Sequence, residues 1–415
     1  MSRLIIPILI LSLIDIYVFK GLHLLLKNME SPWKYIVEVA YGILSVVMLY
    51  QIYHIFSHWN EFRISQPGMV RFWLGIFFVL IFAKLGFTVF HLADDLFWLG
   101  KKIVSLVQPD TLELVGMPIT RGKFITQLGL GISGLLLGAY SYGVIKGRYS
   151  FRILKERIQF DNLPKAFNGL RIVQISDLHL GSFVDDFEEV SRVIPMINEM
   201  QPDLILFTGD LVNSHSDEAE PWIEIFSKLK AKHGKYSIFG NHDYCDYGNY
   251  SKEEKKKSVS RLKEIHGEMG FRLLEDEHEF LTLEDEKIAL VGTHNWGRGF
   301  HKVGDLDKAL DGLDEGYFKI LMSHDPTLWE EKVKDKKSID LTLSGHTHGM
   351  QMGVEVPSLG IKWSPVKYVY KRWAGLYKVG ENHLYINRGL GFLGFPGRVG
   401  IAPEITLLEL STKES

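Results

Sequence analysis

Hydrophobic residues follow two different patterns along this chain, and the change falls near residue 150. Before it, four apolar runs each reach the ~20 residues that a helix needs to cross a bilayer. Asp15 interrupts the first run and no small-residue cleavage site follows it, so we expect a retained span and not a signal peptide. The pattern predicts a membrane domain, residues 1–150, with a helical bundle spanning Leu4 to Leu26, Tyr35 to Ser57, Val70 to His91 and Phe124 to Ile145.

Three ionisable residues, Asp15, Glu38 and Lys84, fall inside these runs. At the centre of a membrane an ionised side chain costs about 2.5–3.5 kcal/mol on insertion scales unless it is paired or faces water. We therefore expect all three to point into the bundle. A path for a small molecule or proton is one explanation, and an interhelical pair such as Asp15 with Lys84 is the other. No paired broken helices or internal repeat marks a transport site, which favours the pair.

After residue 150, short β-branched runs alternate with segments of helical spacing. Runs at 170–175, 204–207 and 236–239 predict buried strands, and the intervening segments 187–200 and 222–229 predict helices. This alternation predicts an α/β domain, residues 151–415, with its site beyond the carboxyl ends of the strands. Further strands are expected at 287–291, 318–322, 341–344, 384–387 and 405–410.

Polar motifs follow these strands directly. Taken singly, each residue has an ordinary explanation as a helix cap, a turn residue or a buried histidine. Together they supply nitrogen and oxygen donors for two ions of the manganese, iron or zinc type, without a sulfur ligand. The candidate ligands are Asp177, His179, Asp210, Asn241, His324, His346 and His348.

Composition narrows the choice of partners. Residues 1–150 hold 13 Lys and Arg against 8 Asp and Glu, whereas the rest of the chain holds 34 against 42. A groove for nucleic acid needs a basic stripe, which this acidic domain lacks, so nucleic acid is not an expected substrate. Cys245 is the only cysteine, which excludes an internal disulfide and a cysteine-based zinc site. We expect it to be a small buried apolar residue.

The motifs D-x-H, G-D, G-N-H-D, H and G-H-x-H occur in an order that resembles the calcineurin-like metallophosphoesterases. The resemblance implies a four-layer αββα sandwich with two divalent metal ions, preceded here by the transmembrane bundle. It also implies that Asp210 bridges the ions. One ion would take Asp177, His179, Asp210 and His348, and the other Asp210, Asn241, His324 and His346.

The membrane-anchored layout resembles the transmembrane group of that superfamily. This group includes relatives of bacterial phosphodiesterases and of the hydrolase that cleaves UDP-2,3-diacylglucosamine in lipid A synthesis. The resemblance implies hydrolysis of a phosphodiester or pyrophosphate bond by a metal-activated water. Competing interpretations are a phosphomonoesterase, or a receptor or transporter that only binds a phosphorylated ligand.

Four residues outside the ligand set are candidates for catalysis or substrate binding. His242 adjoins Asn241, so we expect it to protonate the leaving oxygen, with Asp243 either orienting His242 or forming a turn. Arg388 and Arg398 lie in a glycine-rich tail, where they would bind a phosphate by bidentate contacts or remain solvated.

Between Lys362 and Lys378, basic residues alternate with Trp and Tyr. That mixture is typical of a surface at lipid headgroups, although a hairpin packed on the core would explain it equally. It favours the lipid bilayer as a partner and a phosphorylated, amphiphilic or nucleotide-linked lipid as substrate.

Two opposing sequence signals indicate on which side of the membrane the catalytic domain lies. Thr120 to Ile125 resembles a twin-arginine export signal with its second arginine replaced by glycine, which places the catalytic domain in the periplasm or outside the cell. The basic run from Lys146 to Arg157 favours the cytoplasm instead. We expect a multi-pass membrane protein with an external catalytic domain; the oligomeric state stays open.

Overall fold

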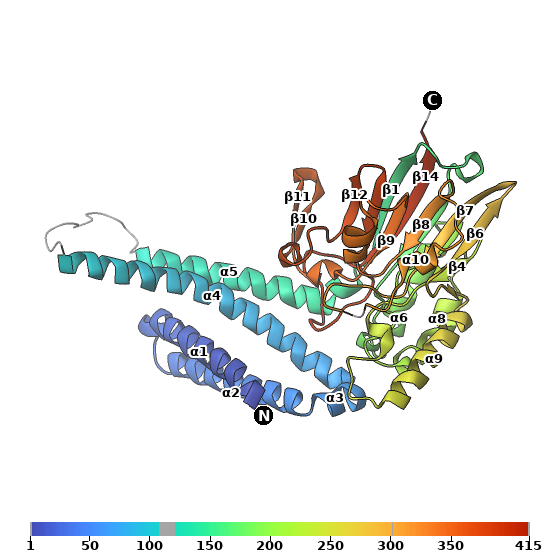
Figure 1. The fold of residues 1–415 in the computed structure, drawn as a ribbon. Helices are drawn as coiled ribbons and strands as arrows, with labels where there is room; N and C mark the ends of the chain where they lie inside the picture. Colours follow the sequence, from blue (N-terminus) through green and yellow to red (C-terminus); the bar gives the residue numbers. More distant parts are fainter. Residues whose placement is uncertain (1, 108–120, 301, 414–415) are drawn as a thin grey trace. The chain divides into compact units, whose positions relative to one another are not determined.

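The computed structural model describes residues 2–107, 121–300 and 302–413, and the chain separates into two compact units, Met1–Val144 and Ile145–Ser415. The first unit is helical (Figure 1). Four of its helices are long and apolar enough to cross a membrane, as the sequence predicts. The helices are α1 (Ser2–Leu25), α2 (Trp33–Ser57), α3 (Trp59–Ser65), α4 (Pro67–Val107) and α5 (Arg121–Ile145).

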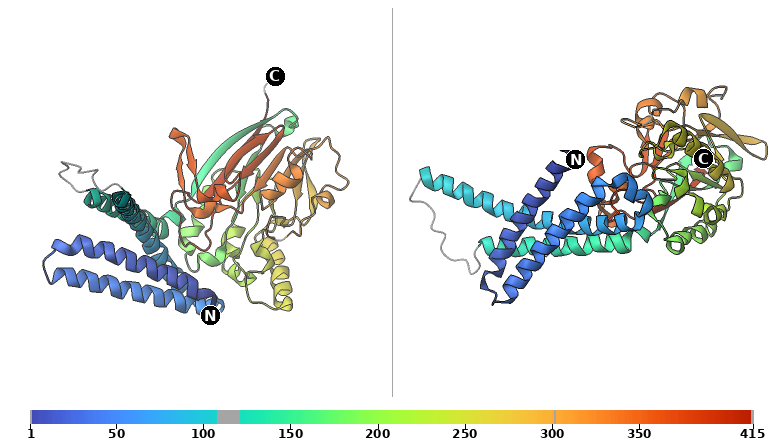
Figure 2. Two further views of the ribbon diagram at one scale, coloured as in Figure 1. Left: turned by 60° about the vertical axis from the view of Figure 1, so that its left-hand side comes forward. Right: turned by 90° about the horizontal axis from the view of Figure 1, so that it is seen from below.

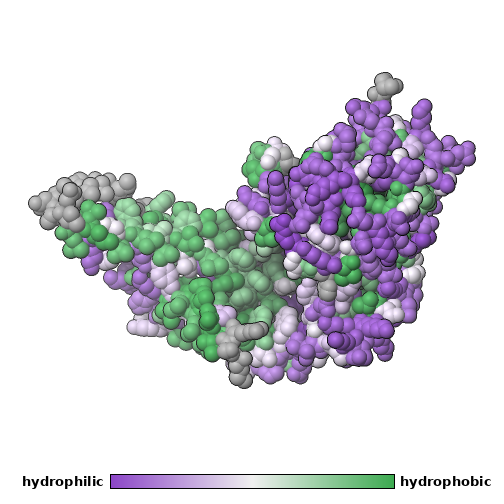
Figure 3. Space-filling model, viewed as in Figure 1, coloured by the Kyte–Doolittle hydropathy of each residue, from purple (hydrophilic) through white to green (hydrophobic). Residues whose placement is uncertain are grey.

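Helix α4 is much longer than the span predicted at Val70 to His91. Its 41 residues extend about 60 Å at ~1.5 Å per residue, twice the ~30 Å of a bilayer core. Because no proline interrupts the helix after Pro67, it continues past Asp94 and Asp95. The described surface of these helices is largely hydrophobic (Figure 3), consistent with contact to lipid.

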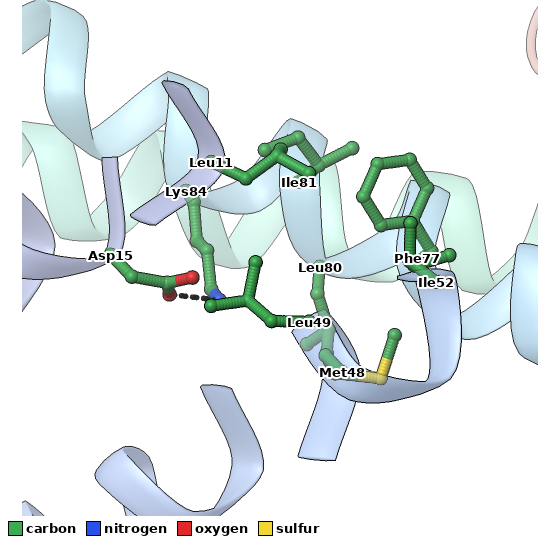
Figure 4. A pocket seen from close by; sticks show the side chains of 9 residues that line it. All are labelled: Leu11, Asp15, Met48, Leu49, Ile52, Phe77, Leu80, Ile81 and Lys84. Atoms are coloured by element: carbon green, nitrogen blue, oxygen red, sulfur yellow. Dashed lines mark hydrogen bonds and ion pairs between the residues drawn. The ribbon is translucent and has the colours of Figure 1, made fainter. Parts of the chain in front are cut away.

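Asp15 of α1 lies at the centre of a polar network between three helices. Its Oδ1 accepts hydrogen bonds from Tyr41 at 2.9 Å and Ser45 at 2.7 Å, both on α2. Lys84 of α4 forms an ion pair with the same oxygen (Figure 4). The interhelical pair expected from the sequence is therefore confirmed. Glu38, the third predicted inward residue, lies 2.9 Å from His23 of α1.

Two six-stranded mixed sheets form the framework of the second unit (Figures 1 and 2). The strand order is β1-β14-β2-β3-β4-β5 in one sheet and β12-β13-β9-β8-β7-β6 in the other, and β10 and β11 form a separate hairpin. The strands are β1 (Arg152–Phe160), β2 (Arg171–Ile175), β3 (Leu204–Phe207), β4 (Lys235–Ser237), β5 (Arg272–Leu273), β6 (Glu277–Leu283), β7 (Glu286–Gly292), β8 (Phe318–Met322), β9 (Leu341–Ser344), β10 (Val354–Val356), β11 (Ile361–Trp363), β12 (Gly375–Val379), β13 (Asn382–Ile386) and β14 (Glu404–Thr412).

The alternation of side chains along each strand divides the core into layers. Ile172 and Leu204 of the first sheet pack against Ile320 of the second, between the two sheets. Their neighbours Val173 and Ile205 face the opposite side and pack against helices. Helix α10 (Leu306–Ala309) belongs to a third cluster on the outer face of the second sheet. The four-layer αββα arrangement is confirmed.

Helices on the outer face of the first sheet are α6 (Phe187–Ser191), α7 (Val193–Asn198), α8 (Ile223–Ser227) and α9 (Lys252–Glu268). A single helix was expected over 187–200, but it breaks at Arg192. Pro195 explains the break, because its ring clashes with the carbonyl of Ser191, four residues earlier.

Candidate metal centre

The predicted ligands follow strands of both sheets and converge at one end of the sandwich. Asp177 and His179 follow β2, Asp210 follows β3, and Asn241 follows β4. These strands run parallel, so their carboxyl ends lie at one edge. From the second sheet, His324 follows β8, while His346 and His348 follow β9; these strands are parallel as well.

Five of these side chains extend from a left-handed backbone. The φ angles are 50° at Asp177, 44° at His179, 60° at Asp210, 72° at His346 and 49° at His348. For residues other than glycine this conformation costs of order 1–3 kcal/mol and is concentrated at functional sites. The loops after the strands therefore hold five of the seven candidate ligands in a costly backbone conformation.

Two glycines permit the close approach of the loops. A Cβ at Gly240 would collide with Asp210, and a Cβ at Gly345 would collide with Ser176 and Asp177. Both glycines are thus required by sterics and not by turn geometry alone.

One group of donors consists of Asp177, His179 and His348, whose ligand atoms all lie within 4.8 Å of one another. The Nε2 atoms of His179 and His348 are 3.1 Å apart, and His348 Nε2 lies 3.2 Å from Asp177 Oδ1. All three side chains are buried.

A second group consists of Asp210, His324 and His346. His324 Nε2 lies 3.1 Å from Asp210 Oδ2 and 3.2 Å from His346 Nδ1. Asp210 Oδ2 is also 3.5 Å from His179 Nε2, so this carboxylate lies between the two groups. That is the position required of a bridging ligand.

Asn241 supplies the clearest sign that a cation belongs here. Its side chain is 1% exposed, and its Oδ1 has no hydrogen-bond partner among the described residues. Its Nδ2 donates to the Tyr247 hydroxyl at 2.7 Å, which leaves the carbonyl oxygen free. A buried acceptor without a partner is costly unless a cation or water satisfies it.

Backbone and side-chain acceptors set the orientation of two histidine rings. Nδ1 of His324 donates to the Thr208 carbonyl at 2.8 Å, and Nδ1 of His179 donates to Asn213 Oδ1 at 3.1 Å. With the proton held on Nδ1, Nε2 of each ring presents its lone pair to the centre. Asn213 was not predicted, because no motif marks a position three residues after Asp210.

Electrostatics in the centre favour an ionised Asp210 and a neutral His179, which are the charge states that metal ligation requires. Burial opposes ionisation of Asp210, but His324, His242 and His179 outweigh it and hold its pKa well below the usual value. Burial and His242 hold the pKa of His179 well below the usual value. For His324, burial lowers the pKa, but Asp210 and Asp177 raise it to about 10. Positive charge is thus favoured between these carboxylates, and a metal ion bound by His324 would replace its proton.

His242 lies beside the first group but is held differently. Its ring centroid is 4.9 Å from that of His179, and its ring stacks on Tyr247 at 4.1 Å. Its Nδ1 donates to the backbone carbonyl of Asn213 at 2.7 Å, so Nε2 is the atom that remains for chemistry. His242, His179 and Asp210 can also approach one cation, so proximity alone does not separate a ligand from a proton donor.

Asp243 contacts the backbone of the loops. It accepts hydrogen bonds from the backbone N–H groups of Gly240 at 2.8 Å, Asp210 at 2.9 Å and Leu211 at 2.8 Å. Burial and the Asp210 charge raise the pKa of Asp243 to about 7. Orientation of the His242 ring, one of the roles expected of Asp243, is supplied by Asn213 instead.

Arg388 and Arg398 are buried and paired with protein groups, so the solvated position offered as one alternative for them is wrong. Arg388 is 7% exposed and pairs with Glu355 and Glu404. Arg398 is 2% exposed and donates to the carbonyls of Arg388 and Gly391. Its Nη2 also lies 3.3 Å from His348 Nδ1. Both arginines support the loops around the centre, and binding of phosphate by either stays a prediction.

Family models match both parts of the chain. A model described as "Calcineurin-like phosphoesterase" matches residues 170–350, and one described as "Probable Calcineurin-like phosphoesterase, transmembrane domain" matches residues 1–148. The second match and the four candidate spans together support a membrane protein.

Several relatives carry the same domain. "Uncharacterized metallophosphoesterase YkuE" of Bacillus subtilis is 35% identical over 254 residues, which are 60% of this chain and 82% of the relative. "Transmembrane protein with metallophosphoesterase domain" of Danio rerio is 30% identical over 262 residues, 60% of this chain and 55% of the relative. This chain belongs to the calcineurin-like metallophosphoesterases, a family of metal-dependent phosphoester hydrolases. Its clustered Asp and His residues fit a dimetal site.

Proposed function

We propose that this protein is a membrane-anchored dimetal hydrolase that cleaves a phosphodiester or pyrophosphate bond. The observation that carries the proposal is the convergence of six Asp and His donors from two sheets, five of them on left-handed backbone, beside a loop that holds the unpartnered Asn241 oxygen. Asp177, His179, Asp210 and His348 would hold one ion, and Asp210, Asn241, His324 and His346 the other. The donor set suits Mn, Fe or Zn.

A pair of divalent ions, when bound, supplies an activated water and charge stabilisation for the phosphoryl oxygens. The protein's own contribution to bond cleavage is His242. Because the Asn213 carbonyl accepts from Nδ1, the ring is fixed with Nε2 turned outward, and its imidazolium form would deliver the Nε2 proton to the leaving oxygen.

The substrate class that we propose is an amphiphilic phosphorylated molecule, such as a phospholipid or a nucleotide-linked lipid. Its support is the membrane unit, together with aromatic side chains at the centre. The Tyr370 hydroxyl lies 2.8 Å from His346 Nε2, and Tyr247 is 41% exposed beside His242. UDP-2,3-diacylglucosamine is one member of this class.

Hydrolysis by the detergent-solubilised full-length protein with Mn²⁺ tests this function. The panel consists of bis-p-nitrophenyl phosphate, p-nitrophenyl phosphate and UDP-2,3-diacylglucosamine, with Asp210→Asn as the inactive control. We expect cleavage of the diester or the nucleotide lipid and its loss in Asp210→Asn. Preference for p-nitrophenyl phosphate would instead indicate a phosphomonoesterase. Absence of metal-dependent turnover on every one of the three substrates would favour a protein that only binds phosphorylated ligands.

For the membrane orientation, we propose that the catalytic unit lies outside the cytoplasm. Thr120, the first residue of the export-like motif, lies outside the described residues. A Lys252→Cys variant at the exposed start of α9 would be labelled by a membrane-impermeant maleimide in intact cells. Labelling only after lysis would place the unit in the cytoplasm.

A further inference from the structure

The β10–β11 hairpin presents its apolar face outward. Its cross-strand pairs are Val354 with Trp363, Glu355 with Lys362, and Val356 with Ile361. Because side chains alternate between the faces of a strand, the two apolar pairs share one face and the charged pair occupies the other.

The charged face is directed toward the catalytic unit. Glu355 Oε1 accepts hydrogen bonds from buried Arg388, at 2.7 Å from Nη2 and 3.2 Å from Nε. Lys362 donates to the Ala374 carbonyl, and its Nζ lies 5.0 Å from the centroid of the Trp373 ring. These contacts fix the register, so the hairpin cannot turn its apolar face inward by a one-residue slip. A sheet on a water-soluble surface normally shows the opposite arrangement, with its polar face outward.

The outward face is exposed and continues into the next segment. Val354 is 48% exposed, Ile361 45% and Trp363 40%, and Leu359 in the turn is 71% exposed. In Figure 3, which has the same view as Figure 1, hydrophobic surface lies where Figure 1 labels β10 and β11. We call the hairpin surface the set formed by Val354, Leu359, Ile361, Trp363, Tyr368 and Val369, the last two being 76% and 70% exposed.

We propose that the hairpin surface lies in the headgroup region of the bilayer that holds the chain's own membrane helices, and that it prefers anionic lipids. A short segment joins the last membrane helix to the catalytic unit, because α5 ends at Ile145 and β1 begins at Arg152. Exposed Lys367 and Lys371 flank the aromatic residues, as in segments that lie at an anionic lipid surface. An exposed two-stranded ribbon is only marginally stable in water, and lipid would cover it.

The hairpin surface is adjacent in the chain to the metal centre. Val369 precedes Tyr370, whose hydroxyl lies 2.8 Å from His346 Nε2. Lipid at this surface would therefore lie near the candidate ligands. This last step, delivery of an amphiphilic substrate from the bilayer, rests on the function proposed above; contact with lipid does not.

Spin labelling of the full-length protein in nanodiscs tests the contact. A nitroxide at Leu359→Cys reports on the hairpin turn, and one at Asp285→Cys reports on the polar turn of the β6–β7 hairpin as a matched control. The native Cys245 is fully buried, and burial raises the pKa of its thiol to about 11, so it should not compete for the label. Unmodified protein checks this.

In nanodiscs of phosphatidylcholine and phosphatidylglycerol, we expect oxygen to relax the label at 359 more than a water-soluble nickel chelate does, and the reverse at 285. Lys367→Glu with Lys371→Glu should reduce the depth at 359. Equal access of the nickel chelate at both positions would overturn the proposal. Protection from both reagents with dipolar broadening would also overturn it, because a second copy of the chain would then cover the surface. Neither readout needs metal or turnover, so it is independent of the hydrolase assay.

Discussion

Five of the seven candidate ligands have a left-handed backbone. Their identities and order are visible in the sequence, but the positive φ angles at Asp177, Asp210 and His346 are not. Such a conformation depends on contacts from distant loops, such as the hydrogen bonds from the His346 backbone N–H to Asp177 at 3.0 Å. The ligand set could therefore be predicted, whereas the residues that orient it could not.

Asn213 should control metal affinity without binding metal. Its side chain orients His179, and its carbonyl orients His242. Asn213→Ala removes only the first contact, so we expect affinity for Mn²⁺ to fall about 10–100-fold, as for other residues that orient a ligand. Equilibrium dialysis measures this. Ser182→Ala is the matched control, because it removes a hydroxyl that is hydrogen-bonded to the Asn213 side chain and keeps Asn213 itself; an equal loss in both variants would contradict the role of Asn213.

His266 should make the catalytic unit less stable in acid. Burial lowers its pKa to about 3, compared with about 6.5 in an unfolded chain. The unfolded state takes up the proton first, so stability is lost as pH falls from 6.5 toward 3. His266→Leu should therefore reduce the decrease in unfolding free energy between pH 7 and pH 5 by about 2 kcal/mol. Denaturant unfolding at both pH values measures it, and an equal pH dependence in the wild type and His266→Leu would contradict the prediction.

At the scale of the element, helix α9 illustrates which signals are local. The charged stretch from Asp246 to Lys263 predicts a solvated helix face, and α9 buries Leu262 and Ile265 on its other side. By contrast, β10 and β11 are three residues each, and their inverted orientation depends on contacts with Arg388 and Ala374, which lie outside the hairpin. Local pattern predicts the first element but cannot predict the second.

The capping box at the N-terminus of α9 should contribute to the stability of the catalytic unit. The Ser251 hydroxyl accepts from the Glu254 N–H at 3.2 Å, and Glu254 accepts from the Ser251 N–H at 2.7 Å. Ser251→Ala should lower the free energy of unfolding by about 1 kcal/mol. Ser260→Ala, at an exposed position inside the same helix, should be neutral when measured by the same melt. Equal effects of the two variants would show that the cap contributes nothing.

In the membrane unit, removal of Lys84 should be destabilising because it leaves the Asp15 carboxylate without its positively charged partner. Lys84→Met leaves the Asp15 carboxylate with only the Tyr41 and Ser45 hydroxyls. We expect a loss of about 3–5 kcal/mol, seen as a lower melting temperature in detergent. Asp15→Asn combined with Lys84→Met should recover most of it. A double variant as unstable as Lys84→Met would show that packing, not charge, holds these helices together.

At the scale of the whole molecule, the site exists only because two sheets stack. Asp177, Asp210 and Asn241 come from loops of the first sheet, and His324 and His346 from loops of the second. Sequence pattern predicts strands β2, β3, β4, β7, β8, β9, β13 and β14 but neither the remaining strands nor the strand order. For example, β14 from the end of the second unit lies between β1 and β2. The layered fold could be named only through resemblance, because long-range strand pairing leaves no local signal.

Metal content of the purified full-length protein tests the dimetal centre most directly. Elemental analysis after reconstitution with Mn²⁺ should give two ions per chain for the wild type. Because Asp210 lies between both donor groups, Asp210→Asn should hold fewer than two ions and lose turnover while remaining folded by circular dichroism. One ion or none in the wild type, or two in an inactive Asp210→Asn, would contradict a centre bridged by this carboxylate.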